Sequence, residues 1–211
     1  AEEHAVVDRH VIAAEPGSGL YVGFNQKVTR EQFITAAKNE TVNDLLQFHP
    51  VQAGDTFLIP AGIVHAIGKG VLLAEIQQPS DITFRIHDWG RTDSNGNSRE
   101  LHLPEAIEAI HYEENFGNFK IDYKAHKNST VQLVRSQYFN TSLLEFDKPL
   151  SKSFVEVDSF IIYICTEGRM HLLYDGEQME MCKGDVVLVP AEMDELQIVP
   201  AQRSKLLEVY C

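Results

Sequence analysis

One short motif occurs twice in this chain and restricts the folds that the chain can adopt. GDTFLIPA at Gly54–Ala61 recurs as GDVVLVPA at Gly184–Ala191, and both copies read Gly-Asp-x4-Pro-Ala. Each copy combines a turn, an apolar strand and a corner, within a part of the chain rich in strand-forming residues. Gly-Asp turns and prolines at strand ends are common in any β protein. A repeated strand and corner on two β-rich halves nevertheless favours two related β-barrels.

Hydrophobic periodicity predicts a mainly β protein with a small helical segment. The helical segment is 29–48, where Thr29 and Gln32 form a capping-box pattern and a break is expected near Asn39. RTDSNGNSRE, residues 91–100, is predicted to be a polar loop with an Asn-Gly turn. The other predicted elements are strands at 19–24, 56–60, 71–77 and 82–88, a helix at 103–112, and strands over most of the chain from about Val131.

Composition narrows the classes of partner. The formal net charge of −13 argues against nucleic acid, because such a surface repels phosphate on average, although a few well-placed cations still permit a small anionic substrate. The longest apolar runs, such as Phe160–Cys165, have the length of strands and are too short to span a membrane. No signal-peptide pattern opens the chain. Three widely spaced cysteines without a C-x-x-C pair predict reduced thiols and a cytoplasmic protein.

A candidate polar site follows the first copy of the motif. His65 stands just after the corner, where a lone histidine is more often structural than a metal ligand. In the next predicted strand Glu75 and Gln77 share one face. Alternation in strand 82–88 would then place one polar row on a single face, consisting of Asp81, Thr83, Arg85 and His87. Such a row is either a solvated face or the lining of a polar pocket inside a barrel.

The residues from Gly54 to Arg91, GDTFLIPAGIVHAIGKGVLLAEIQQPSDITFRIHDWGR, resemble the core of the type I mannose-6-phosphate isomerases, bacterial branch. The combination of P-A-G-x-x-H-A-I, L-x-E-I-Q-Q and S-D-x-T-x-R carries the resemblance, which is strong over 14–110. It implies cupin-type β-jelly-roll barrels, with a catalytic-type barrel at 1–112 and a second, degenerate barrel at 113–211. It further implies one zinc ion and interconversion of mannose 6-phosphate and fructose 6-phosphate through an enediolate.

The same resemblance implies roles for single residues. His65 matches a zinc ligand, Arg85 the active-site arginine, and Asp81 the acidic residue ahead of that arginine. The sequence departs from the family at the other ligands: it contains no Gln-x-His, and Ala5 and Val7 stand where the Lys-x-Glu motif is expected. Two hypotheses follow. The chain is a zinc-dependent isomerase, whole or in part, or it is a metal-free cupin that binds sugar phosphates without catalysis. The oligomeric state is not predicted.

Overall fold

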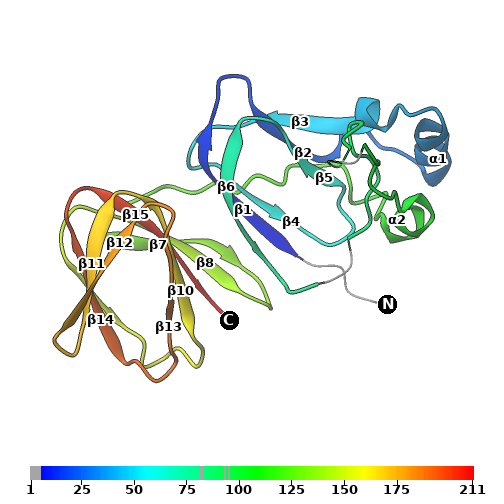
Figure 1. Ribbon diagram of the computed structural model, residues 1–211. Coiled ribbons are helices and arrows are strands. Elements are labelled where there is room, and N and C mark those ends of the chain that lie inside the picture. Colours follow the sequence, from blue (N-terminus) through cyan, green and yellow to red (C-terminus); the bar gives the residue numbers. More distant parts are fainter. Residues whose placement is uncertain (1–5, 81–82, 93, 95) are drawn as a thin grey trace. The chain divides into compact units, whose positions relative to one another are not determined.

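A computed structural model of the protein describes residues 6–80, 83–92, 94 and 96–211 (Figure 1). The chain forms two compact units, Ala1–Lys120 and Ile121–Cys211. The division lies after Lys120, whereas the sequence analysis placed it after residue 112. The segment that follows the last helix stays with the first unit because Lys120 bridges to Phe57 and forms a 2.8 Å ion pair with Asp55.

The first unit contains two antiparallel three-stranded sheets with helices at one end (Figure 1). The sheet orders are β4-β1-β6 and β3-β2-β5. One apolar cluster includes residues of both sheets, and a second packs the helices against Phe24 and Val64. The elements are β1 (Val7–Ala14), β2 (Gly19–Phe24), α1 (Arg30–Lys38), the 3-10 helix η1 (Val42–Leu45), β3 (Leu46–Pro50), β4 (Thr56–Ile59), β5 (His65–Ile67), β6 (Val71–Gln77) and α2 (Leu103–Ala109).

The second unit is built from strands alone, in sheets ordered β13-β10-β15-β8-β7 and β12-β11-β14-β9. Side chains from both sheets form one buried cluster, which includes Tyr163, Met170 and Leu206. The mainly β class predicted from the sequence is therefore confirmed. The strands are β7 (Ser129–Arg135), β8 (Asn140–Phe146), β9 (Leu150–Ser153), β10 (Ile161–Glu167), β11 (Arg169–Tyr174), β12 (Glu177–Cys182), β13 (Val186–Val189), β14 (Glu195–Pro200) and β15 (Ser204–Tyr210).

The repeated motif adopts the same local structure in both units. Its glycine has a positive φ each time, 94° at Gly54 and 97° at Gly184. Its aspartate carboxylate accepts a hydrogen bond from the backbone N–H three residues earlier, at 3.1 Å for Asp55 and 2.7 Å for Asp185. The strands that follow pair with equivalent neighbours, β4 with β1 and β13 with β10. Positions in the two units can therefore be compared one by one.

The predicted helical segment 29–48 is shorter than expected. Thr29 and Gln32 form the capping box, and the helix ends at its C-cap, Asn39. Beyond a single 3-10 turn the chain turns into β3, so the prediction of helix as far as Phe48 was wrong. Tyr21 of β2 pairs with Phe48, and this long-range pairing outweighs the helical spacing of the apolar residues.

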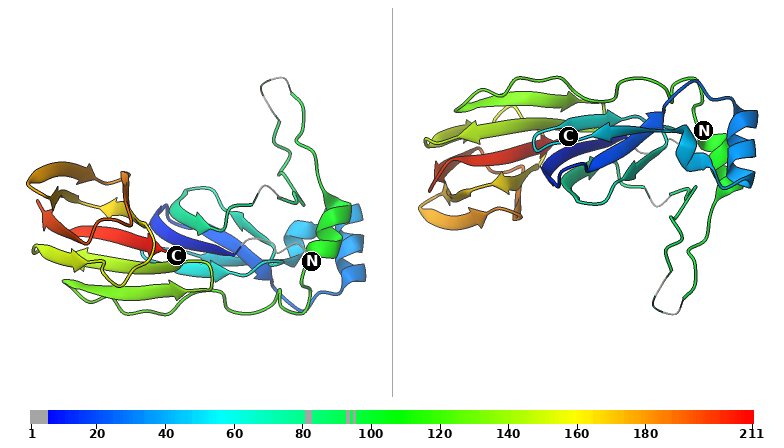
Figure 2. Two further views of the ribbon diagram at one scale, coloured as in Figure 1. Left: turned by 90° about the horizontal axis from the view of Figure 1, so that it is seen from below. Right: turned by 90° about the horizontal axis from the view of Figure 1, so that it is seen from above.

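The predicted strand 82–88 was also wrong for its described part, because residues 83–88 form no ladder. Instead the Arg85 N–H donates to Nδ1 of His102 at 3.1 Å, and the His102 N–H donates to the Arg85 carbonyl at 2.8 Å. Residues 83–92 and 96–102 form the two sides of a long loop that projects from the rest of the first unit (Figure 2). An antiparallel bridge between Thr92 and Ser98 joins the two sides. The alternation assumed for the polar row therefore does not apply.

All three cysteines are free thiols, and Cys165 is buried. Burial raises the pKa of the Cys165 thiol to about 11, so it is protonated at neutral pH and packs as a small apolar group. Among the described residues, no helix is long and apolar enough to cross a membrane.

Candidate functional site

A sharp corner between β4 and β5 presents His65. The Ile63 N–H donates to the Pro60 carbonyl at 3.3 Å, and Gly62 takes a φ of 77°. A Cβ built on Gly62 would lie 2.5 Å from the ring of His111, so the corner needs glycine for space as well as for backbone conformation. The corner thus explains why Pro-Ala-Gly precedes the histidine.

Asn115 fastens this corner, and the sequence analysis did not identify it. Its side chain is fully buried. The Asn115 Oδ1 accepts from the Val64 N–H at 2.8 Å, and its Nδ2 donates to the carbonyls of Gly62 at 2.6 Å and His111 at 3.1 Å. One side chain thereby holds the backbone on both sides of Ile63. No local motif marks this asparagine, because its partners at the corner, Gly62 and Val64, lie far away in the sequence.

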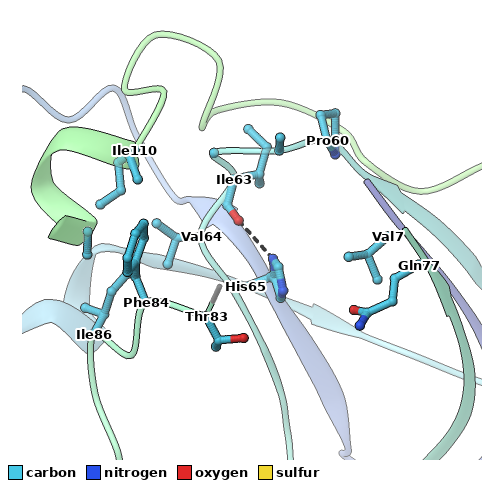
Figure 3. A pocket seen from close by; sticks show the side chains of 14 residues that line it. Val7, Pro60, Ile63, Val64, His65, Gln77, Thr83, Phe84, Ile86 and Ile110 are labelled. Carbon is cyan, nitrogen blue, oxygen red and sulfur yellow. Dashed lines mark hydrogen bonds between the residues drawn. The ribbon is translucent and has the colours of Figure 1, made fainter. Parts of the chain in front are cut away.

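His65 is held in one tautomer. Its Nδ1 lies 2.9 Å from the carbonyl oxygen of Ile63, which can only accept, so Nδ1 carries the proton and Nε2 keeps a lone pair (Figure 3). The His65 residue as a whole is exposed to solvent. Its ring is nevertheless close to many protein atoms, which desolvate it. Desolvation, followed by the positive charge of Arg9, lowers the pKa of His65 to about 4. The imidazole is therefore neutral at pH 7, with Nε2 available as a ligand, base or hydrogen-bond acceptor.

A cavity of about 210 Å³ lies beside His65. Val7 and Gln77, which are opposite each other on β1 and β6, line one part of it (Figure 3). Thr83 and Phe84, from the segment after β6, line another part together with residues of the corner and of α2. The cavity thus combines apolar side chains with the polar side chains of His65, Gln77 and Thr83, a combination that is common in sites that bind small molecules.

Arg9 and Glu75 form an ion pair on the same strand face as Val7. Arg9 lies two residues after Val7 on β1 and opposite Glu75 on β6. Its Nε donates to Oε2 of Glu75 at 2.7 Å, and the arginine is only 6% exposed. Burial lowers the pKa of Arg9, and the charge of Glu75 opposes this change. The sequence analysis missed this pair because it assigned no strand to residues before 19.

The residues that the structure describes do not fit the zinc site that the resemblance implies. No group of three His, Cys, Asp or Glu side chains in the described part of the chain is arranged to hold a metal. Val7, which stands where the family has its glutamate, presents only methyl groups beside His65. A catalytic zinc normally takes three protein ligands. Five acidic or imidazole residues lie outside the described ranges: Glu2, Glu3, His4, Asp81 and Asp93.

Of the other predicted polar residues that the structure describes, Arg85 and His87 do not line the cavity beside His65. The Arg85 Nη1 donates to the carbonyl of Glu100 at 3.1 Å, and Arg85 does not line the cavity. His87 accepts a hydrogen bond from the Trp89 N–H at 3.1 Å. Asp81 falls outside the described residues, so its predicted pairing with Arg85 stays a prediction. Of the predicted polar row, Thr83 alone reaches the cavity among the residues that the structure describes.

A second hollow begins where β5 ends. Lys69, which the sequence leaves as either a turn residue or a phosphate contact, lines it together with Tyr21, Phe48 and Trp89. The guanidinium carbon of Arg91 lies 5.8 Å from the centroid of the Trp89 ring. Two cations therefore stand beside three aromatic rings, close in the sequence to the strand that carries His65.

The antiparallel sheets, together with a match to a cupin-domain family model, place the chain among cupin-type β proteins. Residues 129–204 match the family model described as mannose-6-phosphate isomerase, cupin domain. In sequence, the chain is 30% identical over 190 residues to the mannose-6-phosphate isomerase ManA of Bacillus subtilis, with 90% of this chain covered. It is 30% identical over 183 residues to the mannose-6-phosphate isomerase of Streptococcus mutans, with 86% of this chain covered.

Structural similarity extends over nearly the whole chain. A crystal structure of mannose 6-phosphate isomerase from Bacillus subtilis matches with a TM-score of 0.84 and 24% identity, covering 98% of this chain and 65% of that one. A mannose 6-phosphate isomerase bound with zinc and yttrium matches with a TM-score of 0.70 and 14% identity, covering 98% of this chain and 66% of that one. The chain belongs to the mannose-6-phosphate isomerase family. It spans 59% of the Bacillus ManA sequence and 56% of the Streptococcus sequence.

Proposed function

We propose that the chain carries sugar-phosphate chemistry of its family, the interconversion of mannose 6-phosphate and fructose 6-phosphate through an enediolate. The supporting observation is the neutral His65 beside a cavity, with its Nε2 lone pair free of the Ile63 carbonyl. The reaction moves a proton between C2 and C1, so it needs a base near the sugar and a positive group near the oxygens that gain charge.

Three roles complete this proposal. His65 serves as a ligand of the family's zinc, whose other ligands must come from residues other than the described ones. Arg85 stabilises the negative charge of the enediolate as a permanently cationic donor. Asp81 orients Arg85. Because Arg85 now donates to the Glu100 carbonyl, its side chain must turn to reach a sugar in the cavity.

The proposal also includes a binding place for the phosphate group of the substrate and a cellular compartment for the protein. Lys69 and Arg91 are the cations at the hollow beyond β5, where a phosphate oxygen can accept from either. The three free cysteines favour a reducing compartment, the cytoplasm.

A second candidate function is binding of a sugar phosphate without a metal and without turnover. The observation that favours it is Val7, an apolar side chain at the position where the family resemblance expects a zinc ligand. Under this alternative His65 acts as a hydrogen-bond acceptor for a sugar hydroxyl.

Replacing His65 with alanine tests the first candidate. The protein, freed of metal and reloaded with zinc, should convert mannose 6-phosphate, and a chelator should abolish the conversion. His65→Ala should reduce the rate by roughly a hundredfold or more and reduce the zinc bound per chain, measured by mass spectrometry. His126→Ala, an exposed histidine of the second unit, serves as the control and should match the parent. Equal rate and equal zinc content in His65→Ala would contradict the zinc role.

A further inference from the structure

The hollow that begins where β5 ends is bounded by tightly packed backbone. Its volume is about 550 Å³. A Cβ built on Gly68 would lie 2.3 Å from the Gly19 carbonyl oxygen, and a Cβ built on Gly19 would lie 2.5 Å from the ring of Phe48. Both glycines line the hollow, and neither position has room for a side chain. The Phe48 ring therefore lies directly against the backbone at the side of the hollow.

Trp89 presents its ring to this hollow from a backbone conformation that tryptophan rarely adopts. Its φ is 49°, in the left-handed region. The Trp89 N–H donates to Nδ1 of His87 at 3.1 Å, and the centroids of the two rings lie 5.1 Å apart in an edge-to-face contact. The tryptophan nevertheless remains 43% exposed. An exposed ring that is held at a cost in backbone strain indicates a binding role rather than a packing role.

Three aromatic rings of the hollow form one continuous apolar surface, the aromatic platform, which consists of Tyr21, Phe48 and Trp89. Tyr21 lies between the other two, with its ring centroid 5.2 Å from that of Phe48 and 6.5 Å from that of Trp89. Phe48 is 38% exposed. The two cations of the hollow, Lys69 and Arg91, therefore stand beside an apolar surface that a ligand can reach.

A phosphate ion by itself would use only part of this hollow. Lys69 and Arg91 can satisfy its charge, whereas the aromatic rings and the exposed carboxylate of Glu15 cannot. In a hexose 6-phosphate a single carbon separates the phosphate ester oxygen from the sugar ring, so the ring must lie beside any such phosphate bound here. The C–H groups of that ring match the aromatic platform, and its hydroxyls match a carboxylate acceptor.

The hollow also reaches the edge of the sheet that carries His65. Ile67, which lines the hollow, shares one face of β5 with His65. Two residues along a strand span about 7 Å, and β5 is an outer strand of its sheet. A sugar phosphate that is held by its phosphate and ring in the hollow can therefore extend past β5 toward the histidine.

We propose that the aromatic platform binds the C–H face of the sugar ring and so selects phosphate esters that carry a sugar over inorganic phosphate and acyclic phosphate esters. This inference rests on the proposed function, which places the phosphate of the substrate at Lys69 and Arg91. It deepens that function by naming the groups that recognise the ring.

Trp89 is the only tryptophan of the chain, so its fluorescence reports directly on this hollow. Mannose 6-phosphate, titrated into the zinc-loaded protein, should change the emission saturably and bind roughly tenfold more tightly than glycerol 3-phosphate, which has no ring. Phe48→Ala should remove most of that difference, whereas Lys69→Met should weaken the binding of both esters. The matched control is Phe160→Ala, which removes a ring that is 42% exposed in the second unit and should bind as the parent does.

Trp89→Gly separates binding from packing, because glycine relieves the strain of the positive φ while the ring is removed. Calorimetry should show roughly tenfold weaker binding of mannose 6-phosphate, with a nearly unchanged melting temperature. A lower melting temperature together with the affinity of the parent would show that the ring only packs, and would refute the platform.

The other outcomes separate this inference from the proposed function. If mannose 6-phosphate and glycerol 3-phosphate bind equally tightly, or if Phe48→Ala and Trp89→Gly bind the sugar phosphate as the parent does, the aromatic platform is refuted while the proposed function stands. If the parent binds mannose 6-phosphate without a change in Trp89 emission, the sugar lies elsewhere and the platform is again refuted. If neither fluorescence nor calorimetry detects binding, both proposals fail.

Discussion

Replacing Asn115 with alanine should lower the free energy of unfolding by about 2–5 kcal/mol and loosen the corner that presents His65. The substitution removes the acceptor of the Val64 N–H and the donor to the Gly62 carbonyl. Each of these buried backbone groups would then lack its partner, at about 1–3 kcal/mol apiece. Chemical denaturation followed by circular dichroism measures the loss.

Asn118→Ala is the matched control for this substitution. The Asn118 side chain accepts one hydrogen bond, from the Lys120 N–H at 3.1 Å, at an exposed position. Its loss should change the stability by less than about 0.5 kcal/mol. Mannose 6-phosphate affinity should fall in Asn115→Ala alone, measured below its melting temperature. Equal stability of the two variants would show that Asn115 does not hold the corner.

Replacing Lys152 with methionine should destabilise the protein by about 3–5 kcal/mol, because it leaves a buried carboxylate without its cation. The Lys152 Nζ lies 2.8 Å from Oε2 and 3.0 Å from Oε1 of Glu208. Burial and, after it, the charge of Glu208 raise the pKa of Tyr163, so its hydroxyl remains a donor to that carboxylate. Hydrogen bonding from tyrosine alone should not replace the lost cation.

A second substitution separates the charge from the packing. Glu208→Gln, added to Lys152→Met, removes the buried negative charge and should restore most of the lost stability, as judged by the midpoint of urea unfolding. Lys205→Met serves as the control, because Lys205 pairs with Glu167 at 2.9 Å where the glutamate side chain is 49% exposed. That variant should lose at most about 1 kcal/mol. Equal stability of Lys152→Met and Lys205→Met would show that the buried ion pair contributes no more to stability than the exposed one.

Local sequence patterns predicted many elements correctly. β2 and β6 have the bounds that alternation and turn residues indicated, and the capping box at Thr29 begins α1 as expected. The two copies of Gly-Asp-x4-Pro-Ala form the same turn and strand because glycine with a positive φ and an aspartate that accepts from the backbone act locally. Information of this kind lies within a few residues, so the sequence alone contains it.

The errors arose where distant residues decide the outcome. Residues 46–48 have helical spacing of apolar side chains, yet they join a sheet because β2 offers them a ladder. Residues 83–88 have the alternation of a strand, yet no strand pairs with them, and the ring of His102 takes the Arg85 N–H instead. Because a strand is stable only beside a partner, its pattern cannot show whether that partner exists.

The sequence by itself determined the β class, the repeated motif, the position of His65 after its corner, and the family resemblance. Only the tertiary structure decided which side chains surround that histidine. It placed Val7 beside the imidazole, paired Arg9 with Glu75 in the interior, and used Asn115 to hold the corner. These contacts join residues far apart in the chain, and burial and partnership, which fix the chemistry of a polar group, exist only once the sheets have formed.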